Sequence, residues 1–274
     1  MVLAYVLMGA AAGMLGALVG VGGGIFVVPA LTLAFGIPIH TAIAASLVGV
    51  IGTSTSATVG YLRRDFSNVR LGMILEVGTT IGAVVGGLIG LSLGRQVLSG
   101  IFGVVVLALA ISLLRRRGQS ERGQVVGDDD GRLGGRYHDP NLDKEVSYGV
   151  RRLPLGLAAS FVAGNLSGLL GIGGGVIKVP VMTIAMGVPP KAAIATSNLM
   201  IGVTACASAY LYYSRGYVDP VVTVPVVLGV IGGALVGSRI VPRVRSSRLL
   251  VGLAAVMLVV AVQMLLAAFG VSYR

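Results

Sequence analysis

The sequence predicts an all-α polytopic membrane protein made of two inverted five-element repeats, each with a broken, glycine-rich helical hairpin and three spanning helices. Composition is the first reason: the chain of 274 residues is 55% apolar and only 11% charged, whereas soluble domains have about a quarter charged residues. The second reason is that 16 of the 31 charges lie between Arg115 and Arg152, so the other 236 residues hold only 15. The third is an internal repeat.

The two halves of the chain align without a gap at an offset of 151 residues. Gly20-Val-Gly-Gly-Gly-Ile-Phe-Val-Val-Pro29 corresponds to Gly171-Ile-Gly-Gly-Gly-Val-Ile-Lys-Val-Pro180. Fifteen of the 34 positions from 20 to 53 are identical to their counterparts, and they include every glycine and proline from 20 to 38. Two unrelated apolar stretches would not share the same spacing of glycines and prolines, so the match indicates a duplication.

Three regions follow from the repeat and the charge distribution. We predict a first transmembrane repeat at 1–114, a polar cytoplasmic linker at 115–153 and a second transmembrane repeat at 154–274. The linker is polar and glycine-rich, which is typical of a flexible segment. Breaker residues and apolar length divide each repeat into five helical elements: 2–19, 24–35, 39–62, 69–93 and 96–114, then 154–170, 175–186, 190–213, 218–240 and 247–269.

The second element of each repeat is too short to span a membrane. About 12 residues make a helix of about 18 Å, against a hydrocarbon core of about 30 Å. The glycines before it allow a backbone break, and Pro29 and Pro180 remove a hydrogen-bond donor inside it. We therefore expect the first two elements of each repeat to form a hairpin that enters the membrane and returns.

The distribution of Lys and Arg predicts the orientation. With a hairpin and three crossings in each repeat, 17 Lys and Arg residues fall on the side of the linker. Only Arg95, Arg215 and Arg274 fall on the other side. Cytoplasmic loops are rich in basic residues, so we predict a multi-pass protein of the cell membrane with a cytoplasmic insert at 115–153 and both termini external. An odd number of crossings per repeat inverts the two repeats, a plan found in transporters.

The glycine breaks predict a binding site for an anion. Each short helix would begin inside the membrane, where its free N–H groups carry partial positive charge and glycine admits a ligand close to the backbone. Close helix packing is the alternative explanation of these glycines. The candidate substrate-binding residues in the two breaks are Gly22, Gly23, Gly24, Gly173, Gly174 and Gly175.

Polar side chains beside the breaks extend this candidate site. Lys178 lies one turn into the second short helix, and a lysine in hydrocarbon is expected to face a cavity, a carboxylate or the substrate. Snorkelling or pairing with Glu76 are its structural alternatives. Ser46, Thr196, Ser197 and Asn198 supply hydroxyl and amide donors for an anion, although serine and threonine in membrane helices often bond to their own backbone.

Glu76 is the one carboxylate well inside an apolar stretch of the sequence. An intramembrane carboxylate suggests a proton or cation path, which makes Glu76 a candidate for proton coupling. Its alternative role is a structural partner of Lys178 or of a helix backbone. Val227 occupies the corresponding position of the other repeat.

Enzymatic activity is not expected. The chain lacks the nucleotide-binding, zinc-protease and dithiol motifs, so we predict no cofactor, no catalytic residue and no metal. The basic residues flank apolar spans, which argues against nucleic acid as a partner. The expected partners are a small anionic substrate and the lipid bilayer, and a homodimer is left open.

The doubled motif G-x-G-G-G-x-x-x-x-P, followed by Gly-x-Pro and, in the second copy, by Ala-Thr-Ser, resembles the TauE/SafE family of membrane transporters. The likeness covers nearly all of both repeats and omits the insert; in the first copy Ala45 replaces the threonine before Ser46. The resemblance implies export of small anions, above all sulfite or organosulfonates, by alternating access between the repeats. A passive anion channel and a non-transporting membrane scaffold are the alternatives.

Overall fold

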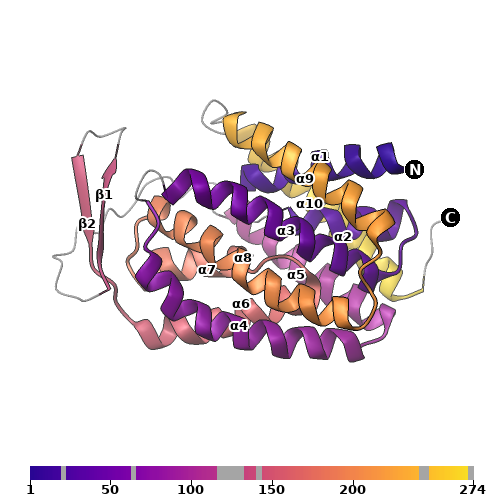
Figure 1. The fold of residues 1–274 in the computed structure, drawn as a ribbon, viewed down its shortest axis with the longest axis horizontal. Helices are drawn as coiled ribbons and strands as arrows, with labels where there is room; N and C mark the ends of the chain where they lie inside the picture. The colour runs from indigo at the N-terminus through magenta and orange to yellow at the C-terminus, as the bar shows by residue number, and fades with distance from the viewer. Residues whose placement is uncertain (20–22, 63–65, 116–132, 140–143, 241–246, 271–274) are drawn as a thin grey trace.

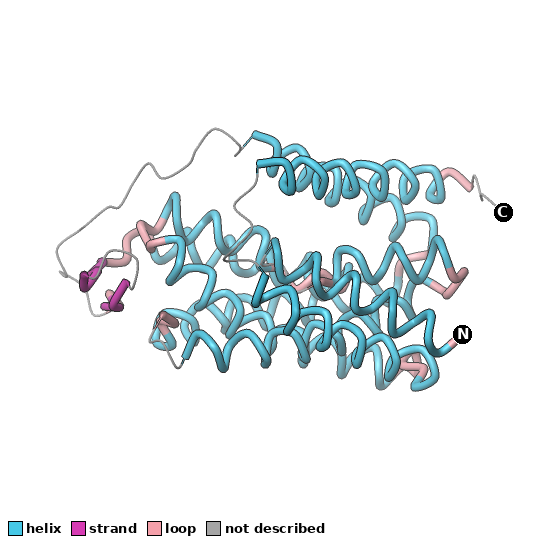
Figure 2. Tube along the Cα trace, turned by 90° about the horizontal axis from the view of Figure 1, so that it is seen from above, coloured by secondary structure: helices cyan, strands magenta, loops and turns pink. Residues whose placement is uncertain are grey.

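The computed structural model describes residues 1–19, 23–62, 66–115, 133–139, 144–240 and 247–270. Long helices run side by side along one common direction (Figures 1 and 2). The first repeat consists of α1 (Val2–Val19), α2 (Gly24–Pro29), the π-helical η1 (Ala30–Ala34), α3 (Ile39–Leu62), α4 (Val69–Ser92) and α5 (Arg95–Arg115). The second consists of α6 (Leu153–Leu170), α7 (Gly175–Pro180), the π-helical η3 (Val181–Ala185), α8 (Pro190–Ser214), α9 (Pro220–Ile240) and α10 (Ser247–Ala268).

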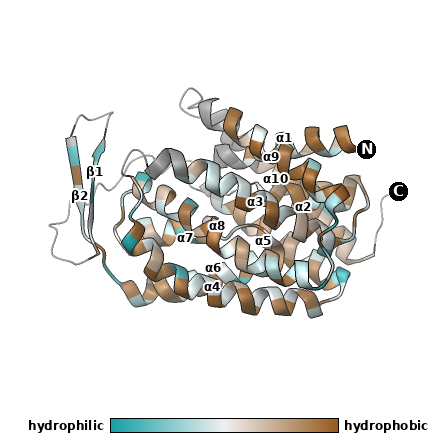
Figure 3. Cartoon of the chain, viewed as in Figure 1, coloured by the Kyte–Doolittle hydropathy of each residue, from teal (hydrophilic) through white to brown (hydrophobic). Residues whose placement is uncertain are grey.

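The prediction of an all-α polytopic membrane protein is confirmed. Among the described residues, α3, α4, α5, α6, α8 and α9 are long and apolar enough to cross a membrane, and Figure 3 colours many residues of the helices as hydrophobic. The set includes α6, which the sequence assigns to the hairpin and not to a span. The predicted crossing by residues 247–269 is not tested, because the assessment covers only Ala254–Ala268 of α10. The 18 residues of α6 correspond to about 27 Å, so length alone does not separate a hairpin arm from a span.

A π-helical turn follows the proline of each short helix. Pro29 ends α2 and Pro180 ends α7, and each is followed by a five-residue π-helix. Proline cannot donate the hydrogen bond of a regular α-helical turn. Thr32 and Thr183, at equivalent repeat positions, donate to the carbonyl oxygens four residues earlier, both at 2.9 Å. The paired irregularity therefore arises from the same sequence feature in both repeats.

Each repeat packs its first helix against the fourth helix of the other repeat. The pairs are α1 with α9 and α6 with α4, and both are close because glycines face the neighbouring backbone. A Cβ on Gly82 or Gly86 would collide with the carbonyl oxygens of Phe161 and Asn165 in α6. Gly229 and Gly233 of α9 face α1 carbonyl oxygens in the same way, which is the small-residue packing expected between membrane helices.

Contacts also define the relative directions of two further helix pairs, α4 with α8 and α5 with α10. In α4 and α8 the chain runs the same way, because Asn68 contacts Thr196 while Glu76, two turns later, contacts Thr204. α5 and α10 pack against each other in opposite directions, since Gly100 faces Ala268 and Gly103 faces Leu265. These directions limit the ways in which the chain can be threaded through a membrane.

The polar insert contains a β-hairpin, which the sequence did not predict. Strands β1 (Gly135–Asp139) and β2 (Lys144–Tyr148) pair antiparallel at one end of the helices, opposite to the start of α1 and the end of α10 (Figure 1). Tyr137 packs edge-on against Phe66, with 5.4 Å between ring centroids. Residues 116–132 and 140–143 of the insert lie outside the described part of the chain, so the expected flexibility of the linker stays a prediction.

Candidate functional site

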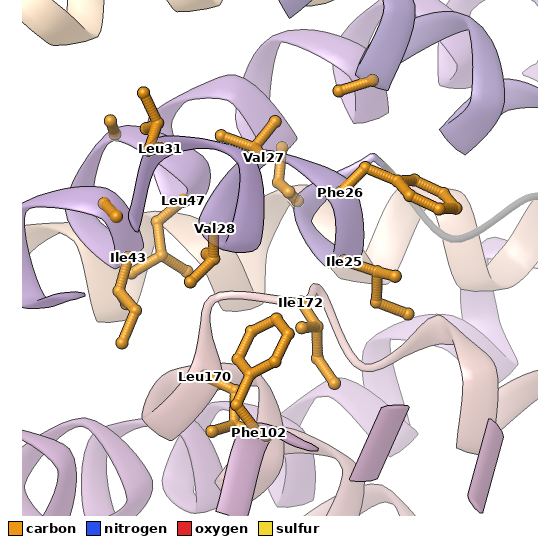
Figure 4. Packing of buried hydrophobic residues seen from close by; sticks show 14 of the residues in the cluster. Ile25, Phe26, Val27, Val28, Leu31, Ile43, Leu47, Phe102, Leu170 and Ile172 are labelled. Carbon is orange, nitrogen blue, oxygen red and sulfur yellow. The ribbon is translucent and has the colours of Figure 1, made fainter. Parts of the chain in front are cut away.

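The two glycine breaks lie against each other in the interior. The start of α2 contacts the backbone after α6: a Cβ on Gly24 would lie 3.2 Å from Ile172 Cα and would collide with the carbonyl oxygen of Gly171. Ser46 of α3 donates a 2.8 Å hydrogen bond to that carbonyl oxygen. Ile25 and Ile172 pack in the same apolar region (Figure 4). The structure thus brings both breaks to one place, as a shared site requires.

Glycine is needed at the breaks for its backbone conformation. The residues preceding α2 and α7 are Gly23 with φ +78° and Gly174 with φ +68°, a left-handed region that strongly favours glycine. Gly175 is buried, and Gly22 lies outside the described residues. Anion binding by these glycines stays a prediction, while close packing accounts directly for Gly24 and Gly174.

Lys178 is buried within this region and does not snorkel. Only 2% of its surface is exposed. Its Nζ donates a 3.3 Å hydrogen bond to Thr204 Oγ1 and lies 3.8 Å from Glu76 Oε2. The cation therefore faces a carboxylate, one of the three environments that the sequence led us to expect.

Two threonines hold the carboxylate of Glu76. Thr204 Oγ1 donates to Glu76 Oε1 at 2.7 Å, and Thr80 Oγ1 donates to the same oxygen at 3.1 Å. Oε2 is buried and has no hydrogen-bond partner in the described structure. Three helices, α4, α7 and α8, therefore contribute to one buried polar cluster consisting of Glu76, Thr80, Lys178 and Thr204.

The polar cluster exists in one repeat only. Val27 stands at the position equivalent to Lys178, Thr53 at that of Thr204 and Val227 at that of Glu76. Val27 is 1% exposed and belongs to the apolar core. A site shared by the two repeats would consequently carry its fixed charges on one side.

The remaining candidate residues differ in whether their side chains already make hydrogen bonds within the protein. Ser46 is bonded to Gly171, Thr196 accepts from the backbone N–H of Asn68 at 3.0 Å, and the Asn198 amide donates to Ile194 at 2.9 Å. The Ser197 hydroxyl is buried and has no hydrogen-bond partner among the described residues. Ser197 is thus the hydroxyl of this set most available to a ligand.

Sequence reasoning missed the roles of Thr80 and Asn68. The spacing of Glu76 and Thr80, four residues apart on a helix, was the available signal for the first. Asn68 caps α4 by accepting from the backbone of Leu71 at 3.0 Å, and its amide donates to the Tyr148 hydroxyl at 3.3 Å. An asparagine before an apolar helix is a common cap, but its link to the insert depends on tertiary structure.

No group of three or more metal-ligating side chains occurs among the described residues.

Broken helices, apolar spans and a buried charged pair are features of polytopic membrane transport proteins. Residues 5–264 match the family model described as sulfite exporter TauE/SafE. The chain belongs to this family, and it is a membrane transporter by that membership.

Curated relatives agree with this assignment. The chain is 27% identical to the probable membrane transporter protein YunE of Bacillus subtilis over 272 residues, which cover 95% of this chain and 96% of the relative. It is 30% identical to YdhB of the same organism over 81% of this chain and 82% of the relative. A probable membrane transporter protein of Methanocaldococcus jannaschii, MJ0441, is 24% identical over 95% of this chain and 94% of the relative. No solved structure matches the chain significantly.

Proposed function

We propose that the protein is a secondary transporter of small anions in the cell membrane, most suited to sulfite or organosulfonates, and that it works as an exporter by alternating access between its two repeats. The observation that carries the proposal is the buried Lys178 ammonium, in the helix that follows one of two adjoining glycine breaks. The family description supports sulfur oxyanions as the substrate class.

The proposed site combines backbone and side-chain donors. The breaks at 23–24 and 173–175 offer peptide N–H groups, Lys178 offers a full positive charge, and Ser197 offers a hydroxyl that has no hydrogen-bond partner among the described residues. Ser46, Thr196 and Asn198 position the surrounding helices through the bonds described above. Such donors replace the water around an anion.

The helix directions support the inverted arrangement of the repeats. If α1 with α2 and α6 with α7 return to their side of entry, α4 and α8 must run in the same direction, as their contacts require. If each pair instead made one crossing, α4 and α8 would run in opposite directions. The hairpin also lies at the end opposite to the start of α1 (Figure 1), in keeping with a cytoplasmic insert and external termini.

A ligand screen followed by a flux assay tests anion transport. Thermal unfolding of the purified protein is measured with sulfite, sulfate, thiosulfate, sulfonates and carboxylates, because a ligand of the folded state raises its stability by mass action. The best ligand is then used in proteoliposomes, where a carrier shows uptake accelerated by substrate on the opposite side. Flux without this acceleration would indicate a channel, and the absence of both binding and flux would contradict the proposal.

Substitution of Lys178 tests the site itself. Lys178→Met removes a charge-assisted contact worth about 1.5 to 3 kcal/mol, so we expect about 10- to 150-fold weaker anion binding. Because Glu76 would then be buried without its cation, the double variant Lys178→Met/Glu76→Gln is measured as well. Val27→Met, at the equivalent position, is the control and should bind almost normally. Similar small effects at both positions would place the site elsewhere.

Cysteine labelling in intact cells tests the orientation. After replacement of Cys206, the single cysteine, new cysteines at Ser147 in the hairpin and at Arg215 between α8 and α9 are treated with a membrane-impermeant thiol reagent. The proposed topology requires labelling at position 215 and protection at 147. Labelling of position 147 from outside would reject it.

A further inference from the structure

We infer that Glu76 is an exchangeable counter-ion of Lys178: an anion that binds the ammonium displaces the Glu76 carboxylate, which takes up a proton in exchange. This inference rests on the proposed anion transport and adds the way in which binding is linked to protons. It is carried by the contacts of Glu76, Lys178 and Thr204, which come from α4, α7 and α8.

The ion pair is incomplete on both sides. A lysine ammonium has three N–H donors, and in the described structure Lys178 makes one hydrogen bond, to Thr204. Glu76 Oε2 lies 3.8 Å from Nζ, beyond the usual 2.7–3.2 Å of a hydrogen bond, and has no other partner among the described residues. A buried charge without its hydrogen bonds is costly. An anion with several oxygens would give the ammonium the acceptors that it lacks.

Thr204 is able to release Glu76 without losing its own hydrogen bond. Its hydroxyl has one hydrogen and two acceptors within reach, Glu76 Oε1 at 2.7 Å and the Met200 carbonyl oxygen at 2.9 Å. When Glu76 leaves the ammonium, the Thr204 hydrogen can turn to Met200, and its oxygen still accepts from Lys178. Thr80 lies on the same helix as Glu76 and can stay bonded to it.

Charge balance requires the proton. Without ligand, the positive Lys178 and the negative Glu76 leave no net charge in the interior. An added anion beside an ionised Glu76 would create a buried net negative charge, which is strongly unfavourable in a membrane. Protonation of Glu76 restores neutrality for a singly charged anion, so the site is neutral both empty and loaded.

The proton comes from the water on the side where the anion binds and is released where the anion leaves. Anion and proton therefore move in the same direction. Net export then requires an outward anion gradient larger than any opposing proton gradient.

Lys178 is the charged group that faces Glu76 among the described residues. α6 carries no titratable side chain, and Lys178 is the one titratable residue of α7. On α4 and α8, Arg70, Cys206, Tyr210 and Tyr213 are exposed, Tyr212 donates to the Leu169 carbonyl oxygen, and Lys191 lies more than three helical turns before Thr204. Glu76 is therefore the group to which the proton is assigned.

Calorimetric titration of the purified protein tests this assignment. Methanesulfonate is the main probe, because it carries a single charge and stays ionised near neutral pH; the doubly charged sulfate and thiosulfate are compared with it. Titrations in two buffers with different heats of protonation give the protons taken up with each anion. For the wild type we expect proton uptake on anion binding. Its affinity for the anion should therefore fall by up to about tenfold for each unit by which the pH rises. Glu76→Gln should bind without proton uptake, and at least about tenfold more tightly at neutral pH.

Matched variants separate exchange from a purely structural pair. Glu76→Asp should restore proton uptake, and Glu145→Gln, the same change at an exposed carboxylate of β2, should leave it as in the wild type. Binding by the wild type without proton uptake, or uptake that persists in Glu76→Gln, would overturn the inference while leaving anion transport intact. Failure of the wild type to bind any anion of the screen would contradict the proposed function itself.

Discussion

The hydroxyl of Ser46 in α3 donates a 2.8 Å hydrogen bond to the carbonyl oxygen of Gly171, at the glycine break of the other repeat. Gly171 has φ +73° and ends α6, so its carbonyl oxygen is not used by a continuing helix. Ser197, the repeat equivalent of Ser46, is equally buried but has no partner among the described residues. The two serines therefore have different tasks, which substitution can separate.

Ser46→Ala should lower stability by about 1 to 3 kcal/mol, because it leaves a buried carbonyl oxygen without its donor. Ser197→Ala removes an unpaired hydroxyl, so stability should stay the same or rise, while anion affinity falls by about two- to tenfold. Thermal unfolding and ligand titration of both variants measure these effects. Equal losses of stability would show that the two serines have the same structural role.

Thr204→Val should destabilise the protein by about 1.5 to 3 kcal/mol, since Lys178 loses a hydrogen bond to its charged group. Thr53→Val is the matched control, because Thr53 stands at the same repeat position and donates to Val50 in its own helix at 3.0 Å. Its effect on thermal stability should be clearly smaller. If Thr53→Val is as damaging as Thr204→Val, the polar cluster is not what makes Thr204 important.

Gly86→Ala should cost about 1 to 3 kcal/mol, because the new methyl group would collide with the Asn165 backbone and force α4 and α6 apart. Gly232→Ala, inside helix α9, places the same methyl group where no atom lies within 4 Å, so it should be neutral or slightly stabilising. Thermal unfolding in one detergent compares the two variants. A neutral Gly86→Ala would show that the helices can shift without cost.

High pH should release the insert hairpin from the helices. Burial raises the pKa of the Tyr148 hydroxyl above its ordinary value of 10.0, an effect that the hydrogen bond from Asn68 reduces. The docked hairpin therefore favours the neutral hydroxyl, so its docking is fully favourable below pH 10.0. Docking is lost as the pH rises through the higher pKa of the docked state.

Cleavage of the hairpin by subtilisin, followed from about pH 8 to about pH 11, measures this release. Tyr148→Phe keeps the buried ring but has no ionisable hydroxyl, so it corrects for the pH dependence of the protease. The wild type should become more susceptible than Tyr148→Phe only at the alkaline end. Parallel behaviour of the two proteins over the whole range would exclude Tyr148 as the cause.

The sequence by itself determined where the helices begin and end. The predicted ranges 2–19 and 39–62 coincide with α1 and α3, and the other helical boundaries differ by at most a few residues. Glycine and proline set the local backbone, and the length of an apolar run reflects the bilayer. These signals reveal the helix boundaries without knowledge of the tertiary structure, and because of the duplication they occur in both repeats.

Tertiary structure alone decided the contacts between distant segments. Lys178 and Glu76 lie on separate helices, and Glu76 has no acidic counterpart in the other repeat, so repeat comparison could not establish their contact. The hairpin was missed because two five-residue strands are marginal alone; Phe66 and Asn68 stabilise them by packing and hydrogen bonding. Ser46 and Ser197 are identical in sequence and differ only in what faces them. The physical reason is that each of these features depends on how helices far apart in the chain pack together.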